Sequence, residues 1–186
     1  MKRIFDIIFA ILLILLLFFP MILFAVIIKI DSIGPVIHYS RRIGRYNKIF
    51  VMLKFRTMKI NAPQVSTDKL KSSSKYITSV GKFLRKSSLD ELPQLFNIIY
   101  GSMSFVGPRP GLFNQISLKI NRTKLGIHQL TPGITGLAQI NGRDLIKDKK
   151  KIQYDLEYLN ERNFFYDIKI IFKTIIYAFI KKDISH

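Results

Sequence analysis

The stretch IIFAILLILLLFFPMILFAVII, residues Ile7–Ile28, decides how this chain folds. A helix needs about 20 consecutive apolar residues to cross the hydrocarbon core of a bilayer, and this run is long enough. It is too long for a cleavable secretory signal, and no small-residue cleavage site follows it. Two interpretations remain open. The run is either a helix that crosses the membrane or one that enters, bends and returns to the same side.

The flanks of the run and its internal proline favour the second interpretation. Lys2 and Arg3 precede the run and Lys29 follows it, so both ends carry the basic residues that mark a cytoplasmic flank. Pro20 removes one backbone hydrogen bond and crowds the turn before it. We therefore predict a re-entrant helix-break-helix anchor over residues 1–33, broken at Pro20, with both ends on the cytoplasmic side.

The composition of the chain is basic and cysteine-free. Its 186 residues include 30 Lys+Arg against 12 Asp+Glu, which gives a formal net charge of +18. Apolar residues make up 48%, which excludes a disordered chain, and their concentration in one run excludes an ordinary soluble globule. The lack of cysteine excludes a disulfide scaffold and a cysteine nucleophile. No recognised nucleic-acid motif accompanies the charge, so the expected partners are anionic substrates and an anionic membrane leaflet, and not nucleic acid.

Residues 34–186 are predicted to form one compact globule on the cytoplasmic face of the membrane. Hydrophobic periodicity and turn residues predict a mainly α fold with a few short strands, of the α+β class. The predicted strands are Val36–Tyr39 and Lys48–Phe55, and the predicted helices are Val80–Arg85, Leu92–Tyr100, Ile152–Asn163 and Phe164–Ile180. The last helix is amphipathic and basic, so it lies either in the membrane interface or against the core of the globule.

Two adjacent carboxylates stand out in RKSSLDELPQLFN, residues Arg85–Asn97. Ser88 and Glu91 match a helix capping box, but a helix capped by Ser88 would place Pro93 where its missing N–H breaks a hydrogen bond. A helix that begins nearer Asp90 puts Pro93 in the first turn, where proline is tolerated. The start of a helix stabilises negative charge, so we expect this position to help keep Asp90 ionised. The alternative is a plain acidic helix cap.

Four segments in order carry a family resemblance: KFRTM, RKSSLDELPQLFN, SFVGPRP and LTPGITGLAQINGRD, which begin at Lys54, Arg85, Ser104 and Leu130. With the proline-containing apolar segment before them, they make the chain similar to the monotopic phosphoglycosyl transferases of the bacterial sugar transferase family. The match is to the small, single-module type, since no further transmembrane helix precedes the anchor. One departure is Phe19 before the membrane proline, where many members carry serine, which leaves the local geometry of the bend open.

The resemblance implies an enzyme on the cytoplasmic face of the bacterial inner membrane, with residues 34–186 as its catalytic domain. Members move a sugar-1-phosphate from a UDP-sugar to polyprenyl phosphate and release UMP, and later glycosyltransferases extend the product into a glycoconjugate. Carried over, Asp90 is the nucleophile that holds the phosphosugar covalently. Glu91 assists it, either through a magnesium ion held by Asp90 and Glu91 or by handling a proton.

Five cationic residues in these motifs are candidates for binding phosphate, since phosphoryl transfer depends on positioning and charge stabilisation. They are Arg85, Arg109, Lys54, Arg56 and Arg143. Lys54 and Arg56 alternate with Phe55 on a predicted strand, so we expect both to face the same side. A solvated surface charge is the alternative for each. For the whole chain the alternative is a non-catalytic basic scaffold that recruits glycosylation enzymes to the membrane.

Overall fold

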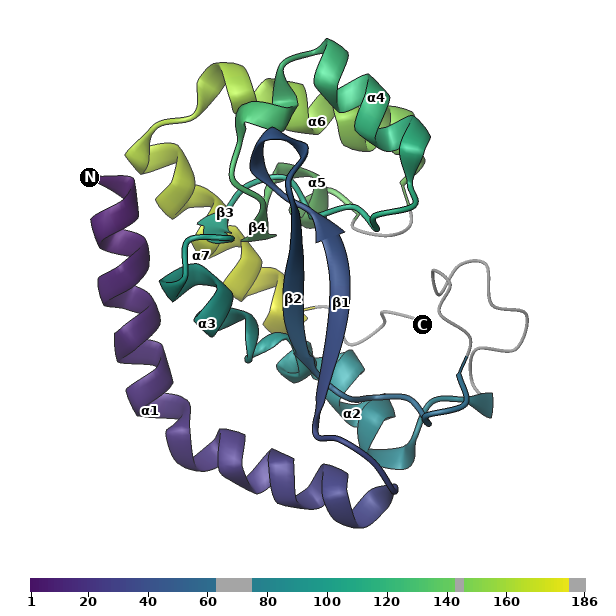
Figure 1. The fold of residues 1–186 in the computed structure, drawn as a ribbon. Coiled ribbons are helices and arrows are strands. Elements are labelled where there is room, and N and C mark those ends of the chain that lie inside the picture. Colours follow the sequence, from purple (N-terminus) through teal and green to yellow (C-terminus); the bar gives the residue numbers. More distant parts are fainter. Residues whose placement is uncertain (63–74, 143–145, 181–186) are drawn as a thin grey trace.

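The computed structural model describes residues 1–62, 75–142 and 146–180 (Figure 1). It is mainly helical with a few short strands, as predicted. In chain order the elements are α1 (Lys2–Asp31), β1 (Ile37–Ile43), η1 (Arg45–Asn47), β2 (Ile49–Phe55), α2 (Ser79–Ser87), η4 (Leu89–Glu91), α3 (Gln94–Ile99), β3 (Ser104–Val106), α4 (Ile116–Lys124), η5 (Ile127–Gln129), β4 (Gly133–Thr135), α5 (Leu137–Ile140), α6 (Asp148–Glu161) and α7 (Phe164–Ile180).

The apolar run forms α1, a single helix that includes Pro20. Its N-terminal part runs alongside the globule and its C-terminal part turns underneath it (Figure 1). The predicted bend is therefore present, but as a change of direction within one helix and not as an interruption. A proline removes only its own N–H from the hydrogen-bond ladder, so the helix can continue beyond it.

Most apolar side chains of α1 are left uncovered by the globule. Its most apolar window has a mean hydropathy of 3.3, and only 6% of that window is buried. Leu16 is 73% exposed and Phe19 is 79% exposed. A helix this apolar would be buried in the core of a soluble protein, so its exposure favours contact with lipid.

The N-terminal end of α1 is joined to the globule by polar side chains. The Lys2 ammonium donates to the Val106 carbonyl (3.0 Å) and pairs with the Asp167 carboxylate. Asp6, which is buried, accepts a hydrogen bond from the Phe105 N–H (3.3 Å). The contacts to Val106 and Phe105 attach the first turns of the anchor to β3.

The C-terminal end of α1 is held by Arg56, which directly follows β2. Its Nη2 donates to the Ser32 carbonyl (2.6 Å) and hydroxyl (2.8 Å), and its Nη1 donates to the Ile33 carbonyl (3.1 Å). The whole residue is only 5% exposed. A buried guanidinium thus supplies donors to carbonyls at and beyond a helix end, which lack partners within the helix.

The rest of the chain forms two small sheets enclosed by helices. Strands β1 and β2 make an antiparallel hairpin in which His38 lies opposite Lys54, while β3 and β4 pair in parallel. A large apolar cluster lies under β3 and includes Ile98 and Ile170, and a smaller one joins Ile28 of α1 to Phe55 and Leu84. The division of the chain at residue 33 stays a prediction, and α1 contributes residues to both clusters.

Helix α7 combines features of the two interpretations that its sequence left open. Ile170 and Asp167 on one side are buried against the globule, whereas Phe165 is 81% exposed and Phe172 is 63% exposed. The helix is therefore a core helix on one face and presents large apolar side chains on the other.

Candidate active site

The two carboxylates lie in a tight turn between two helices. Ser88 ends α2 in the left-handed conformation (φ 58°), the 3-10 turn η4 follows, and Pro93 is the N-cap of α3. The capping box does not form, because Ser88 makes no side-chain capping bond to the turn that follows it. Asp90 and Glu91 thus come just before a helix that starts at the proline, and both are buried.

Lys54, near the end of β2, lies against both carboxylates. Its Nζ is 2.7 Å from Glu91 Oε1 and 3.6 Å from Asp90 Oδ2. All three side chains are largely withdrawn from solvent, so the attraction is screened less than in a surface ion pair. The structure therefore brings the KFRTM and RKSSLDELPQLFN motifs together through one ammonium group.

The position of Lys54 is set by Asn97 of α3. The Asn97 side chain accepts a hydrogen bond from the Leu53 N–H (2.9 Å) and donates one to the Val51 carbonyl (2.7 Å). Both partners belong to β2, so this amide continues the hydrogen bonding of the strand and fixes α3 beside it. The sequence analysis assigned no role to Asn97, although it ends the motif that contains the carboxylates.

Arg109 and Arg85 add positive charge on other sides of the pair. The Arg109 guanidinium approaches Glu91 Oε1 with Nη1 at 3.3 Å and Nη2 at 3.4 Å. Arg85 donates through Nε to the Thr57 hydroxyl (2.8 Å), and its charge acts on Asp90. Lys54, Arg85 and Arg109 are thus three of the predicted phosphate-binding residues that gather around the carboxylates.

Of the two other predicted cations, Arg56 contacts the end of α1 and not this group. Arg56 was expected to face the same side as Lys54, but β2 ends at Phe55 and the Arg56 donors go to the end of α1. Alternation holds only while the strand continues, which explains the difference. Arg143 lies outside the described residues.

Burial raises the pKa of Asp90 above its ordinary value, and the charge of Glu91 raises it further, while Lys54, Arg85 and Arg109 oppose the rise. The net effect at Asp90 is a raised pKa, although the helix start was expected to help keep this group ionised. The reason is that removal of a carboxylate from water outweighs the attraction of the cations around it. The result is an anionic group that is incompletely stabilised, a common property of reactive carboxylates.

A histidine and a further arginine border the site and were not among the predicted site residues. His38 lies directly opposite Lys54 in the hairpin, and its pKa is lowered by burial and by the nearby charges of Arg42, Lys54 and Arg85. Arg42 donates to the Ser40 hydroxyl (3.0 Å) and to the Pro110 carbonyl (3.3 Å). Residues 38, 40 and 42 alternate along β1 and so share one face of the strand, and this spacing in the sequence could have identified His38 and Arg42.

Two glycines, one in SFVGPRP and one in LTPGITGLAQINGRD, shape the backbone support of Arg109. A Cβ on Gly107 would collide with the Thr131 carbonyl, and one on Gly133 would collide with the Gly107 nitrogen. These residues let β3 and β4 approach closely, with the Gly107 N–H donating to the Thr135 carbonyl (2.9 Å). The LTPGITG segment thus packs on the backbone that leads into Arg109.

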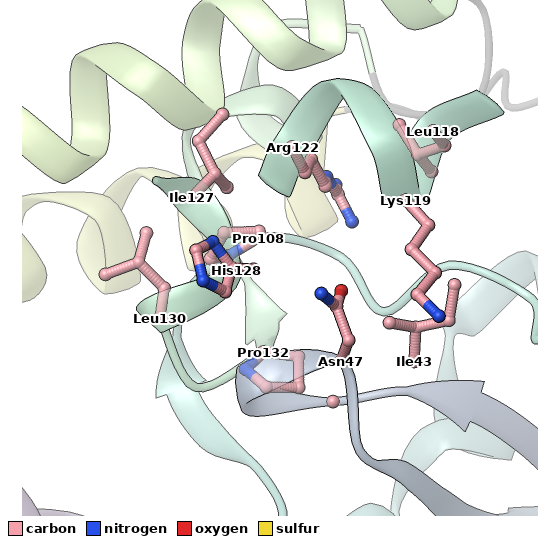
Figure 2. A pocket seen from close by; sticks show the side chains of 11 residues that line it. Ile43, Asn47, Pro108, Leu118, Lys119, Arg122, Ile127, His128, Leu130 and Pro132 are labelled. Carbon is pink, nitrogen blue, oxygen red and sulfur yellow. The ribbon is translucent and has the colours of Figure 1, made fainter. Parts of the chain in front are cut away.

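A small cavity lies beside this support and not at the carboxylates. Figure 2 shows it between α4, η5, the hairpin tip and Pro108. Its walls are mostly apolar, with Asn47, Lys119, Arg122 and His128 as the polar contributors. Neither Asp90 nor Glu91 lines it, so the cavity and the candidate active site are separate.

The site contains two buried carboxylates among three cations, and the chain also carries α1, a helix apolar enough to lie in a membrane. This class of site suits anionic phosphate substrates at a lipid surface. The model of the bacterial sugar transferase family matches residues 1–181 of the chain. The chain therefore belongs to the bacterial sugar transferase family, as its motifs indicated.

Curated relatives in this family are similar over almost the whole chain. A UDP-glucose:undecaprenyl-phosphate glucose-1-phosphate transferase of Escherichia coli is 39% identical over 98% of this chain and 41% of the relative. An undecaprenyl-phosphate galactose phosphotransferase of Salmonella typhimurium is 35% identical over 94% of this chain and 39% of the relative. The uncharacterized sugar transferase EpsL of Bacillus subtilis is 37% identical, with 94% and 85% covered. The chain thus spans about two fifths of the length of the first two.

Proposed function

We propose that this protein transfers a sugar-1-phosphate from a UDP-sugar to undecaprenyl or another polyprenyl phosphate and so starts the assembly of a bacterial glycoconjugate. One observation carries the proposal: Asp90 and Glu91 are buried side by side, and Lys54 contacts both. Membership in the sugar transferase family and the activities in the names of two relatives support it.

In the proposed first step, an Asp90 carboxylate oxygen attacks the phosphorus that carries the sugar. The bond from this phosphorus to the bridging oxygen breaks, UMP leaves with that oxygen, and an aspartyl-phosphosugar remains. In the second step a phosphate oxygen of the polyprenyl phosphate attacks the same phosphorus and displaces the Asp90 carboxylate. The product is a polyprenyl diphosphate sugar. The covalent route divides one difficult displacement into two easier ones.

The surrounding cations suit this chemistry. Charge develops on phosphoryl oxygens and on the leaving UMP, and Lys54, Arg85 and Arg109 lie where they can stabilise it. The raised pKa of Asp90 indicates a carboxylate less stabilised than one in water, which favours its reaction with phosphorus. Glu91 fixes the positions of Lys54 and Arg109 by accepting from both.

A magnesium ion fits this donor set. Mg²⁺ is commonly held by one or two carboxylates together with substrate phosphate oxygens and water, and Asp90 and Glu91 provide such a pair. No cluster of three or more His, Cys, Asp or Glu exists among the described residues. When bound, the ion would neutralise charge on the diphosphate.

A Lys54→Met variant is expected to lose activity at a higher pH than the wild type. The Lys54 charge lowers the pKa of Asp90, so its removal raises that pKa further. The nucleophile must be ionised, and the acid limb of the pH profile therefore moves upward. The dependence of kcat/KM on pH measures this, and an acid limb that stays in place would argue against Asp90 as the titrating group.

The proposed location is the cytoplasmic face of the bacterial inner membrane, with α1 in the lipid and both of its ends on that face. The exposed apolar side chains of α1 and its basic flanks support this. The test labels two single-cysteine variants in intact cells, one with the cysteine at position 1 and the other with the cysteine at position 33. Both should react with thiol reagents only after the reagents reach the cytoplasm, and labelling of position 1 from outside would contradict the proposal.

The experiment that tests the activity uses the full chain in detergent or nanodiscs with polyprenyl phosphate and Mg²⁺. UDP-glucose and UDP-galactose come first because of the relatives' names, followed by UDP-N-acetylated amino sugars. Continuous UMP release, beyond one equivalent per enzyme, is expected to require both substrates for at least one sugar. A chain that binds membranes but releases no UMP from any of them would instead support the non-catalytic scaffold.

A further inference from the structure

We propose that Arg122 and Asp155 form a positioning pair that holds the main chain of Arg109 and so aims its guanidinium at Glu91. The inference rests on the proposed function. It assigns Arg122 a role in that reaction which Arg122 exerts only through Arg109. No motif in the sequence drew attention to either residue. They lie on different helices, α4 and α6, and are 33 positions apart.

The geometry uses both edges of the Arg122 guanidinium. Nε and Nη2 donate to Asp155 Oδ2 at 3.1 and 2.7 Å, while Nη1 donates to the Arg109 carbonyl at 2.9 Å. In Figure 2 the Arg122 side chain projects from α4 toward the segment that contains Pro108. Arg122 therefore connects α6, through Asp155, to the residue that contacts Glu91.

The partner of Arg122 in this pair is a buried carboxylate. Asp155 is 2% exposed, and burial raises the pKa of its carboxyl despite the attraction of Arg122. A buried ion pair often contributes little net stability, because desolvation offsets much of the attraction. What the pair does provide is a rigid guanidinium, with a fork geometry that a lysine ammonium cannot reproduce.

The chain on both sides of Arg109 is restricted, and the contact from Arg122 holds the Arg109 carbonyl itself. Pro108 and Pro110 restrict the chain on both sides, and the Gly107 N–H is bonded to the Thr135 carbonyl. The Arg109 side chain itself is 32% exposed and long, so it would lose much conformational freedom on binding phosphate. Fixing the carbonyl at its base reduces the space that its guanidinium can sample around Glu91.

The test is a double-mutant cycle on UMP release, with Arg122→Lys in the wild-type and Arg109→Ala backgrounds. Lysine keeps the charge that Asp155 requires but cannot also hold the Arg109 carbonyl, so this variant should fold. In the wild-type background kcat should fall about 10- to 100-fold with little change in KM. In the Arg109→Ala background the same substitution should change kcat by less than about twofold, because the group it positions is gone.

Two controls separate positioning from general damage. Lys124 is exposed and lies on the same helix as Arg122, so the Lys124→Gln variant should leave kcat and the unfolding temperature unchanged. Hydrogen exchange of residues 106–111 in the full chain, without substrates, should be faster in Arg122→Lys than in wild type and unchanged in Lys124→Gln.

The outcomes distinguish this inference from the proposed function. Equal kcat losses in both backgrounds, unchanged exchange of residues 106–111, or failure of Arg122→Lys to fold would each overturn the positioning role. If the wild-type chain releases no UMP with any sugar, the proposed function fails, and the exchange measurement alone decides whether the pair holds Arg109.

Discussion

An Asp90→Asn variant is expected to lose at least about a thousandfold in the rate of UMP release, since the amide cannot form the covalent bond to phosphorus. Its fold should be retained, because asparagine has the same shape and avoids the cost of a buried charge that the raised pKa of Asp90 reflects. Release of UMP by a coupled assay measures the loss, and thermal unfolding checks that the variant is no less stable than the wild type.

The matched control is Asp148→Asn, which removes an exposed carboxylate whose partner is Lys151 on the same helix. It should leave the rate unchanged. Mass spectrometry of wild type incubated with a UDP-sugar alone should find a sugar phosphate on the peptide that contains Asp90, and none in the variant. Wild-type rates of UMP release from Asp90→Asn would refute the assignment of the nucleophile.

A Glu91→Gln variant is expected to lose roughly a hundredfold or more in kcat. The Glu91 oxygen that accepts from Lys54 and Arg109 would become part of a neutral amide, so both cations would be held less firmly. The measurement also separates the two roles left open for Glu91. If it binds the metal, the Mg²⁺ concentration for half-maximal rate rises in the variant. If it handles a proton, that concentration stays the same and the pH profile loses one limb.

The control for Glu91 is Glu157→Gln on α6, an acidic residue that takes part in the Tyr166 hydrogen bond and is separate from the carboxylate pair. It should keep the wild-type rate and the wild-type Mg²⁺ requirement. A Glu91→Gln rate within a fewfold of wild type at saturating Mg²⁺ would contradict any essential role for this carboxylate.

The sequence was most informative where residues act within one local motif. The helices Val80–Arg85 and Phe164–Ile180 were found because their apolar spacing is strong. Asp90, Glu91 and Arg109 were singled out because they stand in compact, unusual contexts, and the structure places them together. Proline and glycine at fixed places restrict the backbone, so local pattern and structure agree there.

What could not be predicted depends on contacts between distant parts of the chain. Arg56 has the same charge as Lys54 and follows it at strand spacing, but β2 ends before it and its donors go to the end of α1. The direction of the Asp90 pKa depends on burial, which a sequence does not give. The Arg122–Asp155 pair joins two helices with no shared motif, so only coordinates reveal it.

The way α1 is fastened has a practical consequence for anyone who wishes to work with a water-soluble fragment. Cutting the chain at residue 33 would remove the Lys2 and Asp6 contacts to Val106 and Phe105, take away the carbonyls that accept from the Arg56 guanidinium, and open both apolar clusters. Such a fragment should precipitate or stay unstructured, so crystallisation and inhibitor screening call for the intact polypeptide in a lipid mimetic. Helix α1 is thus a structural part of the globule as well as its attachment to lipid.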